Sequence, residues 1–554
     1  MPLNSPFPRV AIDERPFTAQ LIEKIHEYGQ QDPNKLALID AHNPSDSLTY
    51  RTFYSHIHSL VAFLKSRSFE NNNVACIATT NCWQFAVATL AVTTIGGALS
   101  PASYAFTTCK KKQKRIELKR QIVDCEASVV FCSLDMLSSV RKAVEKSTKV
   151  KTVVIIDNQT EDIELKENEF LFTQTLRFAP DFTPTPNLDA KQHCFLIPYS
   201  SGTTGLPKGV VITHYNMSSI IGMYNEYYAA RIWPKIDPNF EKTKEKMLIL
   251  LPLYHLYGLF LMLKSLLNGM TVILMRRFDE QLFCRCIQDY KIRMLFLVPP
   301  IILFLANSPE VTRYDLSSLK WILTGAAPCG QNVINDVHDR LSNLKYIVQG
   351  YGMTETTVAS HFPVILNTRS NSANVGIVAP NMQQMIVDVK TGKELTKPGE
   401  RGEIVVRGPN IMLGYLNRPK ETAATIRNGW LHTGDIGYVD EQGLLYIVDR
   451  LKELIKVKGL QVPPAELEDL LLSHPRIADA AVIGVKDEKA GELPKAFVVR
   501  KDESLTEKEV FDFVAERVAH YKQLKGGVQF LQTIPRSASG KILRKDLRDQ
   551  EAKL

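Results

Sequence analysis

A stretch rich in glycine and hydroxyl side chains, residues 199–210 (YSSGTTGLPKGV), follows an apolar run at 194–198. Glycines let backbone N–H groups approach an anion closely, and hydroxyls and a lysine add further donors. The stretch therefore predicts a loop that holds a phosphate chain through Ser200, Ser201, Gly202, Thr203, Thr204 and Lys208. It is not a Walker A loop, because Pro207 and Gly209 flank the lysine where that motif requires Gly and then Ser or Thr. Taken alone, this composition would favour a flexible surface loop.

Four further segments follow in order, at residues 349–355 (QGYGMTE), 431–437 (LHTGDIG), 449–459 (DRLKELIKVKG) and 535–544 (PRSASGKILR). In order and wording, the five segments resemble those of the adenylate-forming acyl-CoA synthetase superfamily, which also includes 4-coumarate-CoA ligases, beetle luciferases and adenylation domains of non-ribosomal peptide synthetases. The resemblance covers essentially the whole chain. It implies an acid–thiol ligase that uses ATP, Mg²⁺ and CoA to convert a carboxylic acid first into an acyl adenylate and then into an acyl-CoA.

Activation of a carboxylate by ATP brings two anions together, so positive charge must stabilise the transition state and the departing pyrophosphate. By resemblance, residues 200–208 hold the β- and γ-phosphates, Thr354 contacts the α-phosphate, and Thr204 and Glu355 match positions associated with Mg²⁺. Lys541 matches the lysine that bridges the acyl carboxylate and the α-phosphate, and it is the principal catalytic candidate. Without the resemblance, Glu355 would be read as a helix-start residue and Lys541 as a surface lysine in a basic tail.

The resemblance also assigns the adenosine half of the nucleotide. Tyr351 offers an aromatic face to adenine, Asp435 can accept hydrogen bonds from both ribose hydroxyls, and Arg450 matches a second ribose contact. An aspartate in a Thr-Gly-Asp sequence could instead be an Asx-turn residue. The remaining positions that match nucleotide contacts are Gly325, Ala326, Ala327, Gln349, Gly350, Gly352, Lys452 and Lys456.

In the second half-reaction, the resemblance implies that a mobile C-terminal domain presents another face to the site, where Lys458 and Gly459 match positions that contact CoA. His255 resembles the family's histidine between the acyl site and the CoA tunnel, although a lone histidine beside apolar residues is usually a core residue. The expected acyl pocket consists of His255, Tyr257, Ala326, Gly350, Thr357 and Val358. These residues suit an aromatic or a medium-to-long aliphatic acid without choosing between them.

A chain of 554 residues exceeds what one hydrophobic core usually organises, so at least two domains are expected. Short apolar runs alternate with helix-length segments and predict strands at 74–79, 129–132, 153–157, 247–251, 271–275, 294–298 and 321–323. This pattern is typical of α/β layers with buried sheets. Tighter spacing at 403–448 predicts a β-rich subdomain, and after residue 450 helices at 466–473 and 507–522 with strands at 479–485 and 495–499 predict an α+β unit.

The resemblance completes this picture of an α/β protein. It implies a large AMP-binding domain at 1–449, with two α/β layers and a distorted β-barrel, and a small mobile α+β lid domain at 450–554 with a hinge near Asp449.

Composition is that of a folded globular protein, with 45% hydrophobic and 23% charged residues and a mild net charge of +8. The nine cysteines form no CxxC pair and predict free thiols. The longest apolar run, 294–306, contains Pro299 and Pro300 and is too short to span a bilayer, so it predicts a buried strand and turn and no transmembrane segment. No nucleic-acid partner is expected.

Two further features bear on location and surface. The closing tripeptide, Ala552, Lys553 and Leu554, resembles the peroxisomal Ser-Lys-Leu address and predicts the peroxisomal import receptor as a partner. The basic cluster at 110–120 is by default a solvated face, with an anionic membrane or a CoA phosphate as the alternatives.

Three other functions remain open. A luciferase-type oxygenase makes the same adenylate, although residues 254–257 (YHLY) look more like the ligase version. An adenylation module could load a separate carrier protein, since no carrier serine motif follows Lys541. An inactive nucleotide-binding protein is disfavoured, because Thr204, Glu355, Asp435, Arg450 and Lys541 all match the family pattern.

Overall fold

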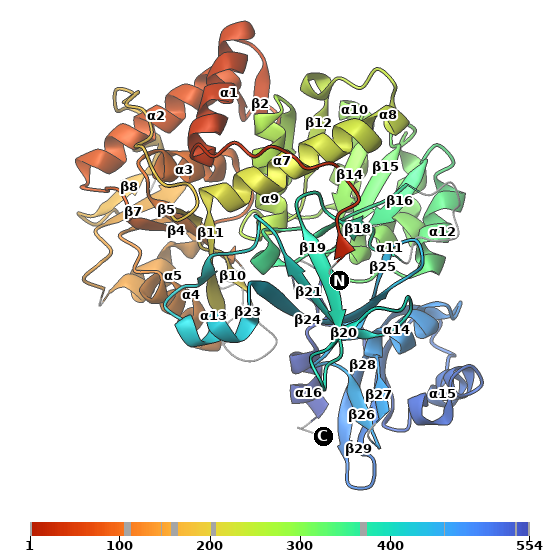
Figure 1. Cartoon of the computed structure of the whole chain (residues 1–554). Helices are drawn as coiled ribbons and strands as arrows, with labels where there is room; N and C mark the ends of the chain where they lie inside the picture. Colours follow the sequence, from red (N-terminus) through yellow and green to blue (C-terminus); the bar gives the residue numbers. More distant parts are fainter. Residues whose placement is uncertain are drawn as a thin grey trace.

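The computed structural model describes residues 3–104, 112–145, 147–156, 164–200, 207–365, 374–458, 460–537 and 540–551. The chain forms a large N-terminal body and a smaller C-terminal lobe, drawn in blue at the lower right of Figure 1. Residues 201–206, Gly459 and residues 552–554, on which several predictions fall, lie outside the described residues.

The first layer of the body is a mostly parallel sheet with helices on both faces, in the strand order β10-β11-β9-β5-β4-β6-β7-β8 with β22 beside β11. Val129 and Phe131 of β6 pack into the core that contains α2 and α3, whereas Val130 and Cys132 pack into the core that contains α4 and α5. Successive side chains of a strand point to opposite faces, which explains why strands covered on both faces read as continuous apolar runs. The elements are β4 (Val74–Ala78), β5 (Ala98–Ala102), β6 (Val129–Ser133), β7 (Thr152–Ile156), β8 (Glu169–Leu171), β9 (Cys194–Leu196), β10 (Tyr199–Ser200), β11 (Lys208–Thr213), β22 (Gly414–Tyr415), α2 (Tyr50–Ser66), α3 (Trp83–Thr94), α4 (Lys112–Asp124) and α5 (Leu134–Val144).

The second layer contains two shorter sheets, β12-β13-β2-β3 and the all-parallel β14-β15-β16. The helix α9 lies buried along most of its length, as expected for a helix that is apolar on nearly every side. The elements are β2 (Leu36–Asp40), β3 (Ser47–Thr49), β12 (Lys246–Ile249), β13 (Thr271–Leu274), β14 (Met294–Leu297), β15 (Trp321–Thr324), β16 (Tyr346–Gln349), α1 (Phe17–Gln31), α7 (His214–Arg231), α9 (Leu256–Leu267), α10 (Glu280–Tyr290), α11 (Pro299–Asn307) and α12 (Gln331–Arg340).

The β-rich subdomain predicted at 403–448 is an antiparallel sheet in the order β1-β19-β21-β24-β23, with β20 on β19 and β25 on β24. Its two edges do not pair with each other within the described residues, so the barrel is open there. The strands are β1 (Leu3–Asn4), β19 (Gln383–Val387), β20 (Glu394–Leu395), β21 (Gly402–Arg407), β23 (Ile426–Arg427), β24 (Trp430–Val439) and β25 (Leu445–Arg450); smaller elements of the body are β17 (His361–Phe362), β18 (Ile377–Val378), α6 (Phe172–Thr175), α8 (Trp233–Ile236) and α13 (Pro419–Thr425).

The C-terminal lobe has its own sheet, β27-β26-β29-β28 with β30 beside β29, and its own apolar core. Because β25 ends at Arg450 in the sheet of the body and β26 begins at Ile455 in the sheet of the lobe, the chain changes sheets next to the predicted hinge. The elements are β26 (Ile455–Val457), β27 (Leu460–Val462), β28 (Ile477–Asp487), β29 (Gly491–Arg500), β30 (Gly527–Phe530), α14 (Pro464–Leu472), α15 (Glu507–Ala515) and α16 (Arg544–Glu551).

The predicted strands of the two α/β layers match the observed ones within two residues at each end. Two predictions are wrong. The run 294–306 is a strand followed by the helix α11, because Pro299 and Pro300 occupy the first helical turn, where the missing N–H groups are tolerated. The helix predicted at 507–522 ends at Ala515, and a short 3₁₀ turn follows at His520–Lys522.

Two expectations about the chain as a whole can be compared with the described residues. Their cysteines are all free, as predicted, while Cys109 lies outside them. None of the helices in the described ranges combines the length and the hydropathy of a membrane-crossing helix.

In the basic cluster, the helix α4 begins at Lys112, and the side chains of residues 112–116 are outside the described part.

Candidate active site

Lys541 lies at the end of a tight loop that the C-terminal lobe inserts against the body. The backbone N–H of Ser537 donates to the carbonyl oxygen of Lys541 at 2.8 Å, and the N–H of Lys541 donates to Oγ of Ser537 at 3.1 Å. Gly540 has a φ of +80°, and a Cβ atom there would lie 3.0 Å from Cδ of Pro300 at the start of α11. Only glycine suits that combination of left-handed backbone and close approach. The loop therefore delivers Lys541 to the body.

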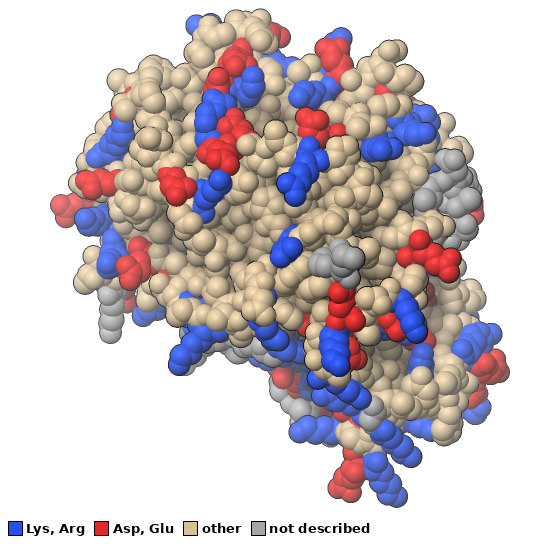
Figure 2. All heavy atoms as spheres, in the orientation of Figure 1, with Lys and Arg blue, Asp and Glu red and all other residues tan. Residues whose placement is uncertain are grey.

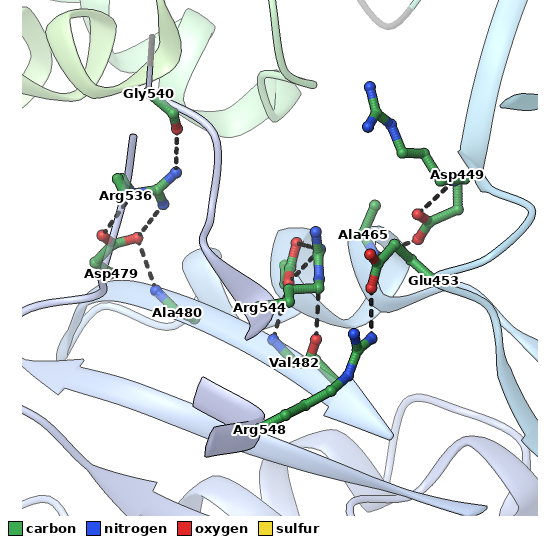
Figure 3. A network of polar contacts seen from close by, with 12 residues as sticks. Asp449, Glu453, Ala465, Asp479, Ala480, Val482, Arg536, Gly540, Arg544 and Arg548 are labelled. Carbon is green, nitrogen blue, oxygen red and sulfur yellow. Dashed lines mark hydrogen bonds and ion pairs between the residues drawn. The ribbon is translucent and has the colours of Figure 1, made fainter. Parts of the chain in front are cut away.

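Arg536 holds this loop from below, as Figure 3 shows. Its guanidinium donates to the carbonyl oxygen of Gly540 at 3.0 Å and to Oδ1 of Asp479 in β28 at 2.8 Å. The loop is thus anchored to the sheet of the lobe through a charge-assisted pair. A movement of the lobe would carry Lys541 with it.

Lys541 comes within electrostatic range of the residues that three separate motifs supply. Burial and the charge of Arg450 lower its pKa, whereas the carboxylates of Asp435 and Glu355 act in the opposite direction. Burial and the charge of Lys541 together lower the pKa of His255 to about 4, so this imidazole is neutral at pH 7. The structure brings together Lys541, His255, Glu355, Asp435 and Arg450, as the resemblance implied.

Asp435 anchors the predicted ribose end of the site. It is 7% exposed, and its Oδ2 accepts a 2.7 Å hydrogen bond from the hydroxyl of Tyr351. Nε of Arg450 lies 3.4 Å from Oδ1, because β24 and β25 pair these two residues directly. Burial raises the pKa of Asp435, although Arg450 opposes this shift. The Asx-turn alternative is wrong, since Asp435 lies within the strand β24.

Glu355 lies at the end of the predicted phosphate loop. It is 4% exposed, and its Oε1 accepts hydrogen bonds from Ser200 Oγ and Tyr415 Oη, both at 2.9 Å. The ends of the loop meet where Ser200 pairs with Lys208, whose Nζ lies 4.6 Å from the centre of the Tyr415 ring. Residues 201–206, and with them Ser201, Gly202, Thr203 and Thr204, lie outside the described residues.

The oxygen atoms at this end suit magnesium. Within the described residues, Oε2 of Glu355 receives no hydrogen bond, so one hard carboxylate oxygen remains available. The same part of the chain contains no group of three or more His, Cys, Asp or Glu side chains that could enclose a metal. A single carboxylate is typical of Mg²⁺ that takes its other ligands from phosphates and water. Glu355 fits such a site.

Gly325, Ala326 and Ala327 directly follow β15, next to the end of β16. We call these three residues, together with Gly350, the wall of the site. Gln349 fixes it, because its side chain accepts from the N–H of Cys329 at 3.0 Å and donates to the carbonyl oxygen of Cys329 at 3.1 Å. Ala326 is exposed and has a φ of +69°. The N–H groups of Gly325 and Gly350 donate to the carbonyl oxygens of Leu297 and Thr324.

A steric restriction explains why residue 352 is a glycine. A Cβ atom there would lie 2.1 Å from the carbonyl oxygen of Val358, so only glycine fits beside the turn that carries Thr354 and Glu355. Gly352 therefore shapes the backbone of this motif. Thr354 is half-buried at the start of the short helix Thr354–Thr356.

Of the residues expected to line the acyl pocket, Tyr257 lies beside Gly325. Tyr257 follows His255 at the start of α9, and its Cε1 lies 3.9 Å from where a Cβ of Gly325 would be. Val358 is half-buried with a φ of +86°. Thr357, in contrast, is fully buried, and its hydroxyl donates to the carbonyl oxygen of Asn410 at 2.7 Å. Its side chain is therefore part of the packed interior and is not accessible to an acyl group in this structure.

Of the predicted CoA residues, Lys458 lies at the tip of the lobe, and Gly459 is outside the described residues. Lys458 has a φ of +49°, and its N–H donates to the carbonyl oxygen of Ala490, at the turn between β28 and β29. Figure 1 shows this tip of the lobe at the end remote from the body, and Figure 2 shows Lys and Arg side chains gathered around it. Lys452, Lys456 and Lys458 are all exposed. The structure therefore gathers Asp435, Arg450 and Glu355 around Lys541 and leaves Lys458 at the remote tip of the lobe.

The hinge is tied to the lobe by a buried carboxylate (Figure 3). Asp449 Oδ2 accepts from the N–H of Ala465 in the first turn of α14 at 3.0 Å, and burial raises its pKa. Close by, Arg544 donates to both carboxylate oxygens of Glu468, at 2.7 and 2.8 Å, and Arg548 donates to Glu453. These contacts fix the last helix and α14 to the segment where the chain changes sheets.

Sequence reasoning missed two residues of the site. Tyr415 donates to Glu355, and Arg536 supports the Lys541 loop. Arg536 stands inside a recognised segment and could have been found there. Tyr415 lies in the two-residue strand β22, which no motif marks, so only its pairing with Val210 of β11 reveals it.

Comparisons with known proteins agree with this geometry. The family model described as AMP-binding enzyme matches residues 25–416, and the one described as AMP-binding enzyme C-terminal domain matches residues 466–541. A probable 4-coumarate-CoA ligase of Dictyostelium discoideum is 35% identical, over 99% of this chain and 97% of the relative. The luciferin 4-monooxygenase of Luciola mingrelica is 37% identical, over 98% of this chain and 96% of the relative.

Among solved structures, ATP-bound MatB from Rhodopseudomonas palustris superimposes with a TM-score of 0.82 at 26% identity, covering 96% of this chain and 98% of that one. The o-succinylbenzoate CoA synthetase MenE of Bacillus subtilis, in complex with its acyl-adenylate intermediate OSB-AMP, gives a TM-score of 0.77 at 26% identity, covering 95% and 98%. Both cover the body and the lobe.

Proposed function

The chain belongs to the AMP-binding family of adenylate-forming enzymes, the acid–thiol ligases similar to 4-coumarate-CoA ligases, and we propose that it converts a carboxylic acid into its CoA thioester through an acyl adenylate. The observation that carries this proposal is the position of Lys541. The lobe places its ammonium among Asp435, Arg450 and Glu355, which come from three separate segments of the body.

In the first step, an oxygen of the substrate carboxylate attacks the α-phosphorus of ATP, and the bond to the β-phosphate oxygen breaks to release pyrophosphate. Lys541 offsets the negative charge that accumulates between the two anions. Asp435 holds the ribose hydroxyls, and Tyr351 contributes a ring for adenine. Glu355 and Thr204 would hold Mg²⁺, which neutralises the phosphate chain when bound.

In the second step, the CoA thiol releases its proton to water, its sulfur attacks the acyl carbonyl carbon, and AMP leaves with the electron pair of the carbon–oxygen bond. The lobe must turn for this step, because Lys458 now lies at its remote tip. The exposed lysines of that tip suit the phosphates of CoA. Rotation would withdraw Lys541 as Lys458 approaches.

The acid is proposed from the relatives and the pocket residues. Several relatives are named 4-coumarate-CoA ligases, and the small residues of the wall accept a flat ring or an aliphatic chain. We therefore propose an aromatic acid like 4-coumarate or a medium- to long-chain fatty acid, the latter placing the enzyme in fatty-acid metabolism. The luciferase relative keeps oxygenation of the adenylate as the second candidate.

The test measures all products of the reaction. Purified protein with MgATP, CoA and aromatic or aliphatic acids should release AMP and pyrophosphate in equal amounts, with acyl-CoA identified by mass. Removal of Mg²⁺ by a chelator should stop the reaction. Pyrophosphate without thioester, together with light or oxygen uptake, would favour the oxygenase; pyrophosphate alone would favour transfer to a carrier protein. No turnover with any acid would contradict the proposal.

The proposed location is the peroxisome, through binding of residues 552–554 to the import receptor. A fluorescent fusion at the N-terminus should colocalise with a peroxisomal marker and become diffuse when the three residues are removed. Unchanged distribution after removal would contradict this proposal.

A further inference from the structure

Lys264 is a charged residue inside the core of the body. It is 1% exposed and lies in α9, surrounded by apolar residues of the same helix. Within the described residues its ammonium forms no ion pair, and its one hydrogen bond, to the hydroxyl of Tyr224 in α7, is long at 3.4 Å. An ammonium has three N–H donors, so most of its hydrogen-bonding capacity is unused.

Two aromatic rings favour the charged form of Lys264, whereas burial opposes it. Nζ lies 4.5 Å from the ring centre of Tyr224 and 4.9 Å from that of Phe296 in β14. The face of an aromatic ring attracts a cation but not a neutral amine. Burial alone lowers the pKa of Lys264 to about 7, since no carboxylate of the described residues opposes the shift.

The ammonium lies on the same side of α9 as Tyr257 of the expected acyl site. Lys264 follows Tyr257 by two helical turns, which places both on one side of α9, roughly 10 Å apart along its axis. Side chains of a helix lean toward its N-terminus, so the long lysine reaches back toward Tyr257. Tyr224 connects the two, because it contacts Lys264 and interacts electrostatically with Tyr257.

A second polar group on this side of α9, the hydroxyl of Tyr257, has no hydrogen-bond partner among the described residues. The hydroxyl of Tyr257 is buried and forms no hydrogen bond with any described residue, although the ring of Tyr257 is partly exposed beside Gly325. Buried polar groups are nearly always hydrogen-bonded in folded proteins, and unsatisfied ones call for a specific explanation. A substrate that runs along α9 would pass the hydroxyl of Tyr257 and end at Lys264.

We propose that Lys264 is the far end of the acyl site and that it binds an anionic oxygen group, so that the preferred substrate is a carboxylic acid with a second carboxylate at its distal end. An anion would give the buried ammonium a counter-charge, which no described residue provides. A methyl-ended chain would leave it unpaired, which selects against plain fatty acids. This inference rests on the proposed function, because it assumes that the wall at Gly325 receives an acyl group.

The test compares acids of equal length that differ only at the far end: methyl, hydroxyl or carboxylate. Each is assayed with MgATP and CoA over a graded series of lengths, with AMP and acyl-CoA as readouts. The wild type should favour the carboxylate-ended acid over its methyl-ended partner by at least about tenfold in kcat/KM. Lys264→Met should reverse this preference, and Lys264→Arg should retain part of it.

A matched control is Lys35→Met. Lys35 is half-buried and its pKa is also lowered by burial, but its ammonium donates to the carbonyl oxygen of Thr243, in the short 3₁₀ helix Lys242–Lys244, which supplies none of the site residues. This variant should keep the selectivity of the wild type. Circular dichroism of each variant, together with its turnover of the acid it prefers, separates a change of selectivity from a loss of folding.

Three results would overturn the inference. If the wild type favours the methyl-ended acid, or favours the hydroxyl-ended over the carboxylate-ended acid, the site does not select an anionic group at the far end of the substrate. If Lys264→Met keeps the preference of the wild type, Lys264 does not determine that preference. In each of these cases acyl-CoA is still made, so the proposed function stands. If none of the acids yields AMP, the proposed function fails and the inference fails with it.

Discussion

The nucleotide end and the acyl end of the site differ in how their polar groups are satisfied. Asp435 is paired with Tyr351 and Arg450, and Glu355 with Ser200 and Tyr415, before any ligand binds. At the acyl end, the hydroxyl of Tyr257 has no partner and Lys264 has only a distant one. This difference is what we expect if the substrate supplies the missing partner at the acyl end, as we propose for Lys264.

The largest effect on activity should come from loss of Lys541, whose charge acts between the nucleotide end and the acyl end. Lys541→Ala removes the charge between carboxylate and α-phosphate, and adenylation should fall at least about 100-fold, as when one preorganised donor is lost. Conversion of a preformed acyl adenylate and CoA into thioester should change far less. Equal losses in the two half-reactions would contradict the assignment. Lys545→Ala, an exposed lysine of α16, should leave both unchanged.

The next effect should appear at the nucleotide end. Asp435→Asn leaves Arg450 without its counter-charge and weakens the ribose contacts, so KM for ATP should rise about 10- to 100-fold, as expected from about 1.5–3 kcal/mol for hydrogen bonds to a charged group. KM for the acid should move little. The control is Asp388→Asn, a turn residue beyond β19, which should keep the ATP response of the wild type. A larger change for the acid than for ATP would contradict the comparison.

At the acyl end, removal of the buried ammonium should stabilise the protein without substrate. Burial lowers the pKa of Lys264 from 10.5 to about 7. The unfolded chain therefore binds more protons than the folded one between these values, and the stability of the wild type increases with pH across this window. Lys264→Met removes this dependence, so its gain in unfolding free energy, about 1–3 kcal/mol, should be largest near pH 7 and small near pH 10.

Thermal unfolding of Lys264→Met and of Lys35→Met at several pH values checks this expectation. The control keeps Lys264, so it should keep the part of the pH dependence that Lys264 contributes and lose only the part that comes from the lowered pKa of Lys35. A destabilised Lys264→Met at neutral pH, or a difference that grows with pH, would show that the acyl end is not strained by its charge.

The smallest effect should come from a residue that acts through another. Tyr415→Phe removes one of the two hydrogen bonds to Glu355, a change of about 1 kcal/mol. The Mg²⁺ concentration for half-maximal activity should rise about fivefold, while kcat at saturating Mg²⁺ should hold. Tyr438→Phe, whose ring stacks on Tyr446 in the β24–β25 pair, is the matched control. A fall in kcat that Mg²⁺ does not restore would argue against a positioning role.

Much of the nucleotide end could be predicted from the sequence, because its residues stand in motifs that follow one another in the order typical of the family. Asp435, Arg450, Glu355 and Lys541 come from four such segments and meet in the structure. The buried strands were also predictable, since both faces of each are covered and the apolar runs are continuous. The helix α11 was not, because two prolines suggest a turn when they open a helix equally well.

The acyl end was predictable only in outline. Thr357 is adjacent to a motif, but its side chain is fully buried and its hydroxyl donates to the carbonyl oxygen of Asn410. Lys264 lies in no motif. The available signal was a single charge in the otherwise apolar stretch Leu256–Leu267, which becomes meaningful only when packing shows that no described carboxylate accompanies it.

The most direct test of the central claim is exchange of labelled pyrophosphate into ATP. Formation of an acyl adenylate is reversible, so the wild type should exchange label only when an accepted acid is present, and should do so without CoA. Lys541→Ala should abolish the exchange. Exchange that requires CoA, or that proceeds without any acid, would contradict an acyl adenylate as the first product of this protein.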